Sequence, residues 1–194
     1  MAQGTLTRGA GALTLVWLAV ATLATAQAAP LATPRTPAKR LTGLPGLQNV
    51  ARINSGLYRG AAPTVEGLRS LKTLGVKTVI NLRHYHGNTE ERACSKLGLD
   101  YVRIALASTD APRDEDVRLF LSIVTDPRRQ PVYFHCLRGK DRTGTLAAVY
   151  RITVEKWPLG DALREMDSFG PFKGYKDLRG YVGRIAEQPT LVWP

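Results

Sequence analysis

The sequence predicts an α/β fold with a central, mainly parallel sheet flanked by helices. Short apolar runs of strand length alternate with segments whose apolar residues recur at helical spacing, and glycine or proline residues separate them. The run 132–134 also leads through a tight polar loop into the apolar segment 146–150. Strands that alternate with helices favour a parallel sheet, and such sheets bind ligands at the carboxyl ends of their strands.

The first half of the folded region carries turn residues and helix boundaries at regular intervals. Thr64 is placed to cap a helix, and Gly75 ends it. Asn88 begins a shorter helix, with Glu91 placed to complete a capping box. The expected elements are, in order, strands over 49–53 and 57–59, a helix over 64–74, a strand over 76–82, a helix from 88 and a strand over 101–104.

The second half begins with a polar loop over 107–112. A helix follows from about Asp114, and Asp126 with Pro127 stops it. The helix over 143–155 is apolar nearly all round, so we expect it to be buried behind the preceding loop. Two further helices, over 159–169 and 175–187, are expected to complete the layer packed on one face of the sheet.

The N-terminal residues are not expected to belong to the fold. Arg8 precedes an apolar segment over 10–23, and small residues follow at 26–28, which is typical of a cleaved export signal over residues 1–28. A membrane anchor is the alternative interpretation. Proline-rich residues 29–45 are expected to form an extended linker, which leaves residues 46–194 as the folded domain. The protein is therefore predicted to be exported to the periplasm or secreted.

The mature protein is predicted to be strongly basic. Removal of residues 1–28 leaves 26 basic and 16 acidic side chains and a formal net charge of +10. Such a balance is compatible with nucleic acid, an anionic membrane surface or a phosphorylated substrate. No zinc-finger spacing or RNA-binding motif accompanies the charge, so we expect no nucleic-acid partner. Transient contact with an anionic membrane surface stays open.

A ten-residue loop joins the strand at 132–134 to the buried helix, with the sequence His135-Cys136-Leu137-Arg138-Gly139-Lys140-Asp141-Arg142-Thr143-Gly144. A loop curled into one turn points its N–H groups inward, with the thiol of Cys136 beneath and the guanidinium of Arg142 at the rim. The helix N-terminus favours the thiolate, and the planar guanidinium matches a phosphoryl group. The loop predicts an enzyme that binds a phosphate monoester and attacks its phosphorus with sulfur.

This loop has the C-x5-R-T signature and resembles the active-site loop of the cysteine-dependent phosphatases, the tyrosine and dual-specificity superfamily. Residues 57–60 with Pro63, and residues 79–83, resemble segments of plant, fungal and bacterial atypical dual-specificity phosphatases. The resemblance extends from about residue 49 to residue 187. It implies a dual-specificity phosphatase-like fold and hydrolysis of phosphotyrosine and other phosphate monoesters through a cysteinyl-phosphate intermediate, without metal or other cofactor.

The resemblance also assigns roles within the loop. Cys136 is expected to be the nucleophile, Arg142 to hold the phosphoryl oxygens, and Thr143 to help expel the thiolate in the second displacement. His135 is expected to order the loop and tune the cysteine. The expected substrate-binding residues are Leu137, Arg138, Gly139, Lys140, Asp141 and Arg142.

The leaving oxygen needs a proton, which an upstream aspartic acid usually supplies. The W-P-D form of that loop is missing from this sequence. Asp110 is the main candidate because it lies between a strand and a helix, where the acid should lie. Asp114 is the second candidate, although a helix cap explains it better. A site without such an acid is the third alternative.

The substrate is left open between two classes. The Gly139-Lys140 pair resembles loops of phosphoinositide and inositol-phosphate phosphatases, so an inositol polyphosphate is an alternative to a phosphorylated protein. A catalytically weak phosphate-binding module is the alternative from another class of protein. The three histidines and two cysteines show no metal-ligand spacing, so no metal site is predicted.

The two cysteines of an exported protein also suggest a disulfide between Cys94 and Cys136 that would switch off the nucleophile. Simple burial of Cys94 on its helix is the alternative.

Overall fold

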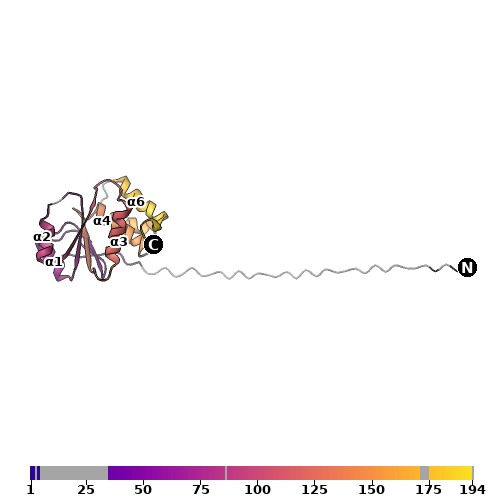
Figure 1. Cartoon of the computed structure of the whole chain (residues 1–194), viewed down its shortest axis with the longest axis horizontal. Coiled ribbons are helices and arrows are strands. Elements are labelled where there is room, and N and C mark those ends of the chain that lie inside the picture. The colour runs from indigo at the N-terminus through magenta and orange to yellow at the C-terminus, as the bar shows by residue number, and fades with distance from the viewer. Residues whose placement is uncertain (3, 5–34, 86, 171–174, 194) are drawn as a thin grey trace. The chain divides into compact units, whose positions relative to one another are not determined.

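The computed structural model describes residues 1, 2, 4, 35–85, 87–170 and 175–193, and range 35–193 holds a sheet with helices on both faces (Figure 1). The six strands of these residues lie in the order β1-β2-β3-β6-β4-β5. The strands are β1 (Lys39–Arg40), β2 (Ala51–Asn54), β3 (Leu57–Gly60), β4 (Thr78–Arg83), β5 (Asp100–Leu106) and β6 (Val132–His135). β3, β6, β4 and β5 pair in parallel. The predicted fold class is confirmed.

Helices cover both faces of this sheet. They are α1 (Val65–Thr73), α2 (Thr89–Lys96), α3 (Asp114–Thr125), α4 (Asp141–Thr153), α5 (Leu159–Ser168) and α6 (Lys176–Glu187), followed by a short 3-10 turn over Pro189–Leu191. α1 and α2 lie on one face, while α3, α4 and α6 lie on the other (Figure 1). Among the described residues, no helix has both the length and the apolar character needed to cross a bilayer.

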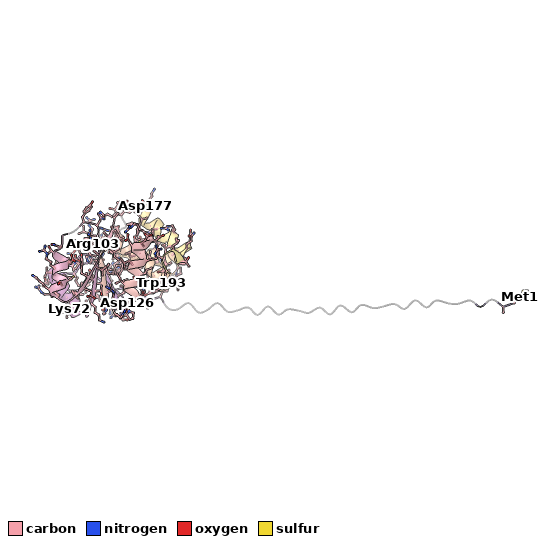
Figure 2. The ribbon with its side chains drawn as sticks, viewed as in Figure 1. Met1, Lys72, Arg103, Asp126, Asp177 and Trp193 are labelled. Carbon is pink, nitrogen blue, oxygen red and sulfur yellow. The ribbon has the colours of Figure 1, made fainter. Side chains whose placement is uncertain are left out.

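The parallel strands direct their carboxyl ends toward one end of the domain. Arg103 of β5 and Asp177 of α6 lie at this end, whereas Lys72 of α1 and Asp126 after α3 lie at the opposite end (Figure 2). β6 lies between β3 and β4 in the middle of the sheet, so the loop that follows it opens at the centre of the carboxyl end. This is the position at which open parallel sheets bind ligands.

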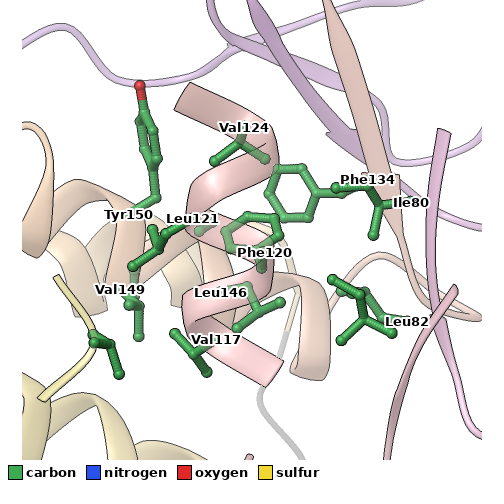
Figure 3. Close-up of a cluster of buried hydrophobic side chains, with 14 of the residues drawn as sticks. Ile80, Leu82, Val117, Phe120, Leu121, Val124, Phe134, Leu146, Val149 and Tyr150 are labelled. Atoms are coloured by element: carbon green, nitrogen blue, oxygen red, sulfur yellow. The ribbon is translucent and has the colours of Figure 1, made fainter. Parts of the chain in front are cut away.

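Alternating strand residues supply two separate cores, one on each face. Val79 and Tyr133 pack on the α1–α2 side, and Ile80 and Phe134 pack on the α3–α4 side. On the second side, the apolar stripe of α3 lies between α4 and the sheet, and Phe120 meets Phe134 edge to face (Figure 3). α4 is buried along nearly its whole length, as its composition predicts. The loop over 135–144 is therefore connected to a helix that cannot shift without disturbing the core.

The structure confirms one of three predicted helix caps and contradicts the other two. Thr64 caps α1 by accepting a hydrogen bond from the Gly67 N–H at 3.1 Å, as predicted. Asn88 precedes α2 but makes no capping hydrogen bond with its side chain, so the predicted capping box is wrong. Asp114 is not a cap either. Arg113 occupies that position, and Asp114 instead accepts hydrogen bonds from Tyr181 and Arg184 of α6.

The predicted linker over 29–45 is wrong for residues 35–45. β1 pairs antiparallel with β2, and the Ala38 N–H donates to Glu165 of α5 at 2.8 Å. Leu41 and Leu44 pack against the α1–α2 core. The residues of this segment do not alternate between apolar and polar side chains, which is the pattern that predicts a strand. Residues 29–34 of the linker and the predicted export signal, apart from residues 1, 2 and 4, lie outside the described residues.

Candidate active site

The predicted loop lies between the end of β6 and the first turn of α4. Cys136 is 3% exposed at its base, and Arg142 lies in the first turn of the helix. Above the thiol is a pocket of about 230 Å³, lined by Ser108, Cys136, Leu137, Arg138, Asp141, Arg142 and Tyr175. The structure thus brings the predicted nucleophile and the predicted phosphate-binding arginine to one cavity at the carboxyl end of the sheet.

Four successive carbonyl groups of the loop are held by hydrogen bonds, one from His135 of the loop itself and three from donors outside it. The Cys136 carbonyl accepts from His135 Nδ1 at 3.1 Å, and the Leu137 carbonyl accepts from the Ala62 N–H at 3.2 Å. The Arg138 carbonyl accepts from Asn49 Nδ2 at 3.1 Å. The Gly139 carbonyl accepts from Asn49 Nδ2 at 3.3 Å and from Arg59 Nη2 at 3.0 Å.

A trans peptide unit holds its C=O and its N–H in opposite directions. The four anchored carbonyls therefore turn the N–H groups of the next residues, Leu137 to Lys140, toward the inside of the loop. The N–H groups at the start of α4 continue this ring, because a helix leaves its first N–H groups without intrahelical partners. Several converging N–H groups at a positive helix end form a binding site for an anion.

Gly139 is required by both the shape of the loop and its surroundings. Its φ of +69° lies in the left-handed region, and a Cβ placed there would lie 2.5 Å from the Gly60 carbonyl carbon and 2.7 Å from the Ala61 nitrogen. The loop is thus pressed directly against the backbone that follows β3. No larger residue fits between them without displacing one of the two.

Two polar residues that sequence reasoning did not assign to the site support this loop. Asn49 has a φ of 49°, which is uncommon for a residue other than glycine. Arg59 is fully buried, and its guanidinium stacks 3.8 Å above the Phe169 ring centroid. Burial lowers the pKa of Arg59 to about 10. Arg59 lies within the segment 57–60 that resembled the family, but nothing in that segment indicates that its side chain reaches the loop.

The pKa of Cys136 lies below its ordinary value. Burial raises that pKa, but hydrogen bonds from the Thr143 side chain and backbone N–H, the charge of Arg142 and the Arg138 N–H together outweigh the burial. The Thr143 hydroxyl is buried, and it has no hydrogen-bond partner among the described residues other than the sulfur. Its proton is therefore available to the sulfur when the sulfur is negative. The site stabilises the thiolate, which is the nucleophilic form of cysteine.

The candidate acids differ in their surroundings. Asp110 is exposed on the loop after β5, where its carboxylate accepts the Thr109 hydroxyl at 2.8 Å. Ser108 of the same loop lines the pocket, but Asp110 does not. Hydrogen bonds from Arg184, more than those from Tyr181, lower the pKa of Asp114. A carboxyl group held ionised by an ion pair is a poor proton donor.

Asp141 has a position that the sequence did not suggest for an acid. It lines the pocket, and one of its carboxylate oxygens is buried without a hydrogen-bond partner among the described residues. Sequence reasoning considered Asp141 only as part of the phosphate-binding loop. Its place inside the pocket adds it to Asp110 as a candidate proton donor.

A second hollow, of about 530 Å³, adjoins the pocket and shares Leu137 and Arg138 with it. Three cationic side chains line it, namely Arg40, Arg138 and Lys140. No ion pair joins any of the three to a carboxylate in the described part of the chain. Arg40 donates instead to Asn49 Oδ1 and to the Ser168 carbonyl. Two of the predicted substrate-binding cations, Arg138 and Lys140, therefore line this hollow together with Arg40, which the sequence did not assign to the site.

The suggested disulfide between Cys94 and Cys136 is not present. Both thiols are free. Cys94 belongs to the core between α1, α2 and the sheet, and Cys136 belongs to the core on the opposite face. The sheet separates them, so a bridge would require large movement of the backbone. Burial raises the pKa of Cys94 to about 12, which makes this thiol unreactive.

No group of three or more histidine, cysteine, aspartate or glutamate side chains is arranged to hold a metal ion within the described ranges.

Comparison with known sequences identifies several similar proteins. Residues 47–170 match the family model "DSP-PTPase phosphatase fused to NAD+ Kinase". The chain is 36% identical over 161 residues to the dual specificity protein phosphatase TpbA of Pseudomonas aeruginosa (strain UCBPP-PA14), covering 80% of this chain and 70% of that protein. It is 30% identical over 133 residues to inositol diphosphatase DSP2 of Oryza sativa subsp. japonica, covering 64% of this chain and 63% of that protein.

Solved structures show the same likeness. The crystal structure of P. aeruginosa TpbA superposes with a TM-score of 0.68 at 29% identity, over 80% of this chain and 93% of that chain. A cysteine-to-serine variant of TpbA in complex with pTyr superposes with a TM-score of 0.67 at 28% identity, over the same shares of the two chains.

Proposed function

Because this chain belongs to the DSP-PTPase family of cysteine-dependent phosphatases, we propose that it hydrolyses phosphate monoesters through a phosphocysteine at Cys136. The buried thiol with its lowered pKa, lying beneath inward-facing N–H groups, is the observation that supports this role most directly. Such a ring stabilises the negative charge that develops on the transferring phosphoryl group.

In the first displacement, the Cys136 thiolate attacks phosphorus, a sulfur–phosphorus bond forms, and the bond to the leaving oxygen breaks. The Arg142 guanidinium and the loop N–H groups hold the phosphoryl oxygens. The leaving oxygen takes its proton from an aspartic acid. We propose Asp110 for this role because it lies on the loop that reaches the pocket through Ser108, and Asp141 is the alternative.

In the second displacement, water attacks the phosphorus of the phosphocysteine and gives a proton to the carboxylate that the first step left ionised, while the sulfur–phosphorus bond breaks and the sulfur leaves as a thiolate. We propose that the Thr143 hydroxyl donates to the sulfur as it departs, because this buried hydroxyl lowers the pKa of Cys136 and has no other partner among the described residues. A hydrogen bond that strengthens as charge develops lowers the barrier rather than the energy of the starting state.

We propose phosphorylated protein side chains as the substrate class, phosphotyrosine foremost. The similarity to a dual specificity protein phosphatase, and to a structure of that protein with pTyr, supports this choice.

An inositol polyphosphate is the second candidate substrate. The hollow that adjoins the pocket supports it, because Arg40, Arg138 and Lys140 supply more positive charge than a single phosphoryl group needs. Similarity to an inositol diphosphatase supports the same class. In this reading the additional cations bind neighbouring phosphates of one ligand.

One substrate panel separates these candidates. Turnover is measured for an aryl phosphate, a phosphotyrosine peptide, a phosphoserine peptide and a set of inositol phosphates, with and without a chelator. For a phosphoprotein substrate, Lys140→Ala lowers all rates alike, and added salt removes the difference. For an inositol polyphosphate, Lys140→Ala lowers only the turnover of multiply phosphorylated ligands. Binding of every ligand without turnover identifies a phosphate-binding module instead.

We also propose that the protein is exported, with residues 1–28 as the signal. The support is the sequence pattern of a basic residue, an apolar segment and small residues. N-terminal sequencing of the protein purified from the periplasm or the medium tests this. Absence of residues 1–28 supports a cleaved signal, whereas a protein that keeps residues 1–28 in a membrane fraction indicates an anchor. Contact with an anionic membrane surface remains a proposal that rests on the basic charge alone.

A further inference from the structure

Both ring nitrogens of His135 face hydrogen-bond acceptors. The residue is fully buried behind the loop. Nδ1 lies 3.1 Å from the Cys136 carbonyl oxygen, and Nε2 lies 2.7 Å from Glu90 Oε1 of α2. A carbonyl oxygen only accepts hydrogen bonds, so Nδ1 must carry a proton. The second contact therefore needs one more proton, either on Nε2 or on Glu90.

The surroundings of Glu90 indicate which group carries that proton. The Glu90 side chain is largely buried, and its Oε2 accepts hydrogen bonds from Arg83 Nη2 at 2.7 Å and from Asn81 Nδ2 at 3.2 Å. An arginine and an amide that both donate to a carboxyl group stabilise its ionised form. Asn81 is itself fixed, because its Oδ1 accepts from the Arg83 N–H at 2.9 Å. An ionised Glu90 leaves the proton on Nε2 of His135.

We propose that Glu90 is a positioning residue that holds His135 in its doubly protonated form, and that this buried cation stabilises the thiolate of the adjacent Cys136. The same contact fixes the plane of the ring, so that Nδ1 anchors the Cys136 carbonyl and turns the Leu137 N–H into the loop. The second half of this inference rests on Cys136 being the nucleophile of the proposed function. The protonation of His135 does not depend on that function.

The other groups near this pair do not exchange protons near neutral pH. The Tyr133 ring stacks on His135 with its centroid at 5.7 Å, and burial raises the pKa of Tyr133. Burial and the charge of Glu90 raise the pKa of Tyr101 to about 12. Burial also raises the pKa of Cys94. Arg83 is cationic, and Glu91 is exposed on α2. None of Tyr133, Tyr101 and Cys94 therefore supplies a proton to the contact between His135 and Glu90 near neutral pH.

The direct test measures the ring nitrogens of the unaltered protein by NMR after histidine labelling with nitrogen-15. Both nitrogens of His135 are expected to carry a proton at pH 7, because each of them lies within hydrogen-bonding distance of an acceptor oxygen. The two other histidines, His84 and His86, serve as internal references. A His135 signal with one unprotonated nitrogen at pH 7 overturns the proposal. This test needs neither turnover nor a substituted protein.

The second test uses Glu90→Gln to separate the effect of the Glu90 charge from the effect of its hydrogen bond to His135. The glutamine amide still donates to a neutral Nε2, so the ring keeps its orientation but loses its second proton. The pH midpoint for alkylation of Cys136 by iodoacetamide is expected to move upward, by up to about one pH unit. Glu91→Gln is the matched control, since it removes the same charge from an exposed neighbour. Equal midpoints for the two variants overturn the proposal.

Kinetics distinguish this role from a purely structural one. Glu90→Gln is expected to lower kcat/KM more below neutral pH than above it, while affinity for vanadate changes little. An equal loss at every pH together with a lower melting temperature contradicts the proposal and indicates a structural role. If the unaltered protein has no turnover at all, the proposed function fails, whereas the NMR and alkylation measurements still decide the state of His135.

Discussion

The loop over 135–144 and the residues that hold it differ in where they lie along the chain. The loop is one contiguous segment between β6 and α4, and its own side chains supply the thiol, the guanidinium and the hydroxyl. The residues that anchor its carbonyl groups come from distant places, namely Asn49, Arg59 and Ala62, and Glu90 supports the loop through His135. Chemistry is thus encoded locally, whereas the geometry of the anion site depends on the whole fold.

This difference has a consequence for substitutions. A change of a reacting side chain within the loop should remove chemistry and leave binding. A change among the anchors should weaken binding of phosphate analogues and leave the reacting atoms in place. A change outside both groups, and away from the proton donor and the cationic hollow, should affect stability alone.

Cys136→Ser should have the largest effect of all. Turnover should fall by several orders of magnitude, because the attacking atom is lost. Affinity for a phosphotyrosine peptide should persist, since the N–H groups and Arg142 remain. Steady-state kinetics and calorimetry measure the two quantities. Substantial residual turnover would exclude the proposed nucleophile, and loss of binding would mean that the loop depends on the thiol for its shape.

Replacement of the proton donor should come next in size. If Asp110 is the acid, Asp110→Asn should lower turnover of an alkyl phosphate by about 10² to 10⁴-fold and that of an activated aryl phosphate much less. Asp141→Asn should show this pattern instead if Asp141 is the acid. The dependence of rate on leaving-group pKa decides between them. If neither variant changes this dependence, the site works without a carboxylic acid donor.

Gly139→Ala should damage the loop through its shape rather than its chemistry. The added Cβ would lie 2.5 Å from the Gly60 carbonyl carbon, and overpacking of this kind costs about 1 to 3 kcal/mol beyond the backbone strain. Gly75→Ala is the matched control. Gly75 also has a positive φ, of +83°, but nothing lies within 4 Å of its Cβ position. The free energies of unfolding of the two variants, measured by chemical denaturation, should differ by this amount. Only Gly139→Ala should lose affinity for vanadate.

Asn49→Gly tests an anchor with its backbone conformation preserved. Glycine accepts the φ of 49°, but the Arg138 carbonyl loses its donor and the Gly139 carbonyl loses one of two. Affinity for vanadate should fall about tenfold, which corresponds to the loss of one or two hydrogen bonds. Lys156→Gly is the control, because Lys156 also has a positive φ, of 57°, and does not contact the loop. Similar affinities for the two variants would remove Asn49 from the anchors.

The same contrast explains which features the sequence could predict. The order of strands and helices and the chemistry of the loop are local patterns, so the fold class, the family and the residues of the pocket floor follow from them. The anchors are single polar residues whose partners lie far away in the chain, such as Asn49, and no periodicity marks them. Spacing suggested that Glu91 would cap α2, but Glu90 is the residue that faces inward. The sequence does not predict β1, because this two-residue edge strand pairs through its backbone and has no apolar face.

Asp114→Asn should have the smallest effect, on stability alone. Asp114 joins α3 to α6 by accepting from Tyr181 at 2.9 Å and from Arg184 at 3.0 Å. The Arg184 side chain is 46% exposed, so solvent screening limits the loss to about 1 kcal/mol or less. Because the Arg184 hydrogen bond lowers the pKa of Asp114 in the folded protein, this stabilisation is complete above the unfolded pKa and disappears as the pH falls through the lower, folded pKa. The free energies of unfolding of the unaltered protein and of Asp114→Asn should therefore differ near pH 7 and converge in acid. The variant should also keep the leaving-group dependence of the unaltered enzyme, whereas a change in that dependence would mean that Asp114 takes part in the chemistry despite its ion pair.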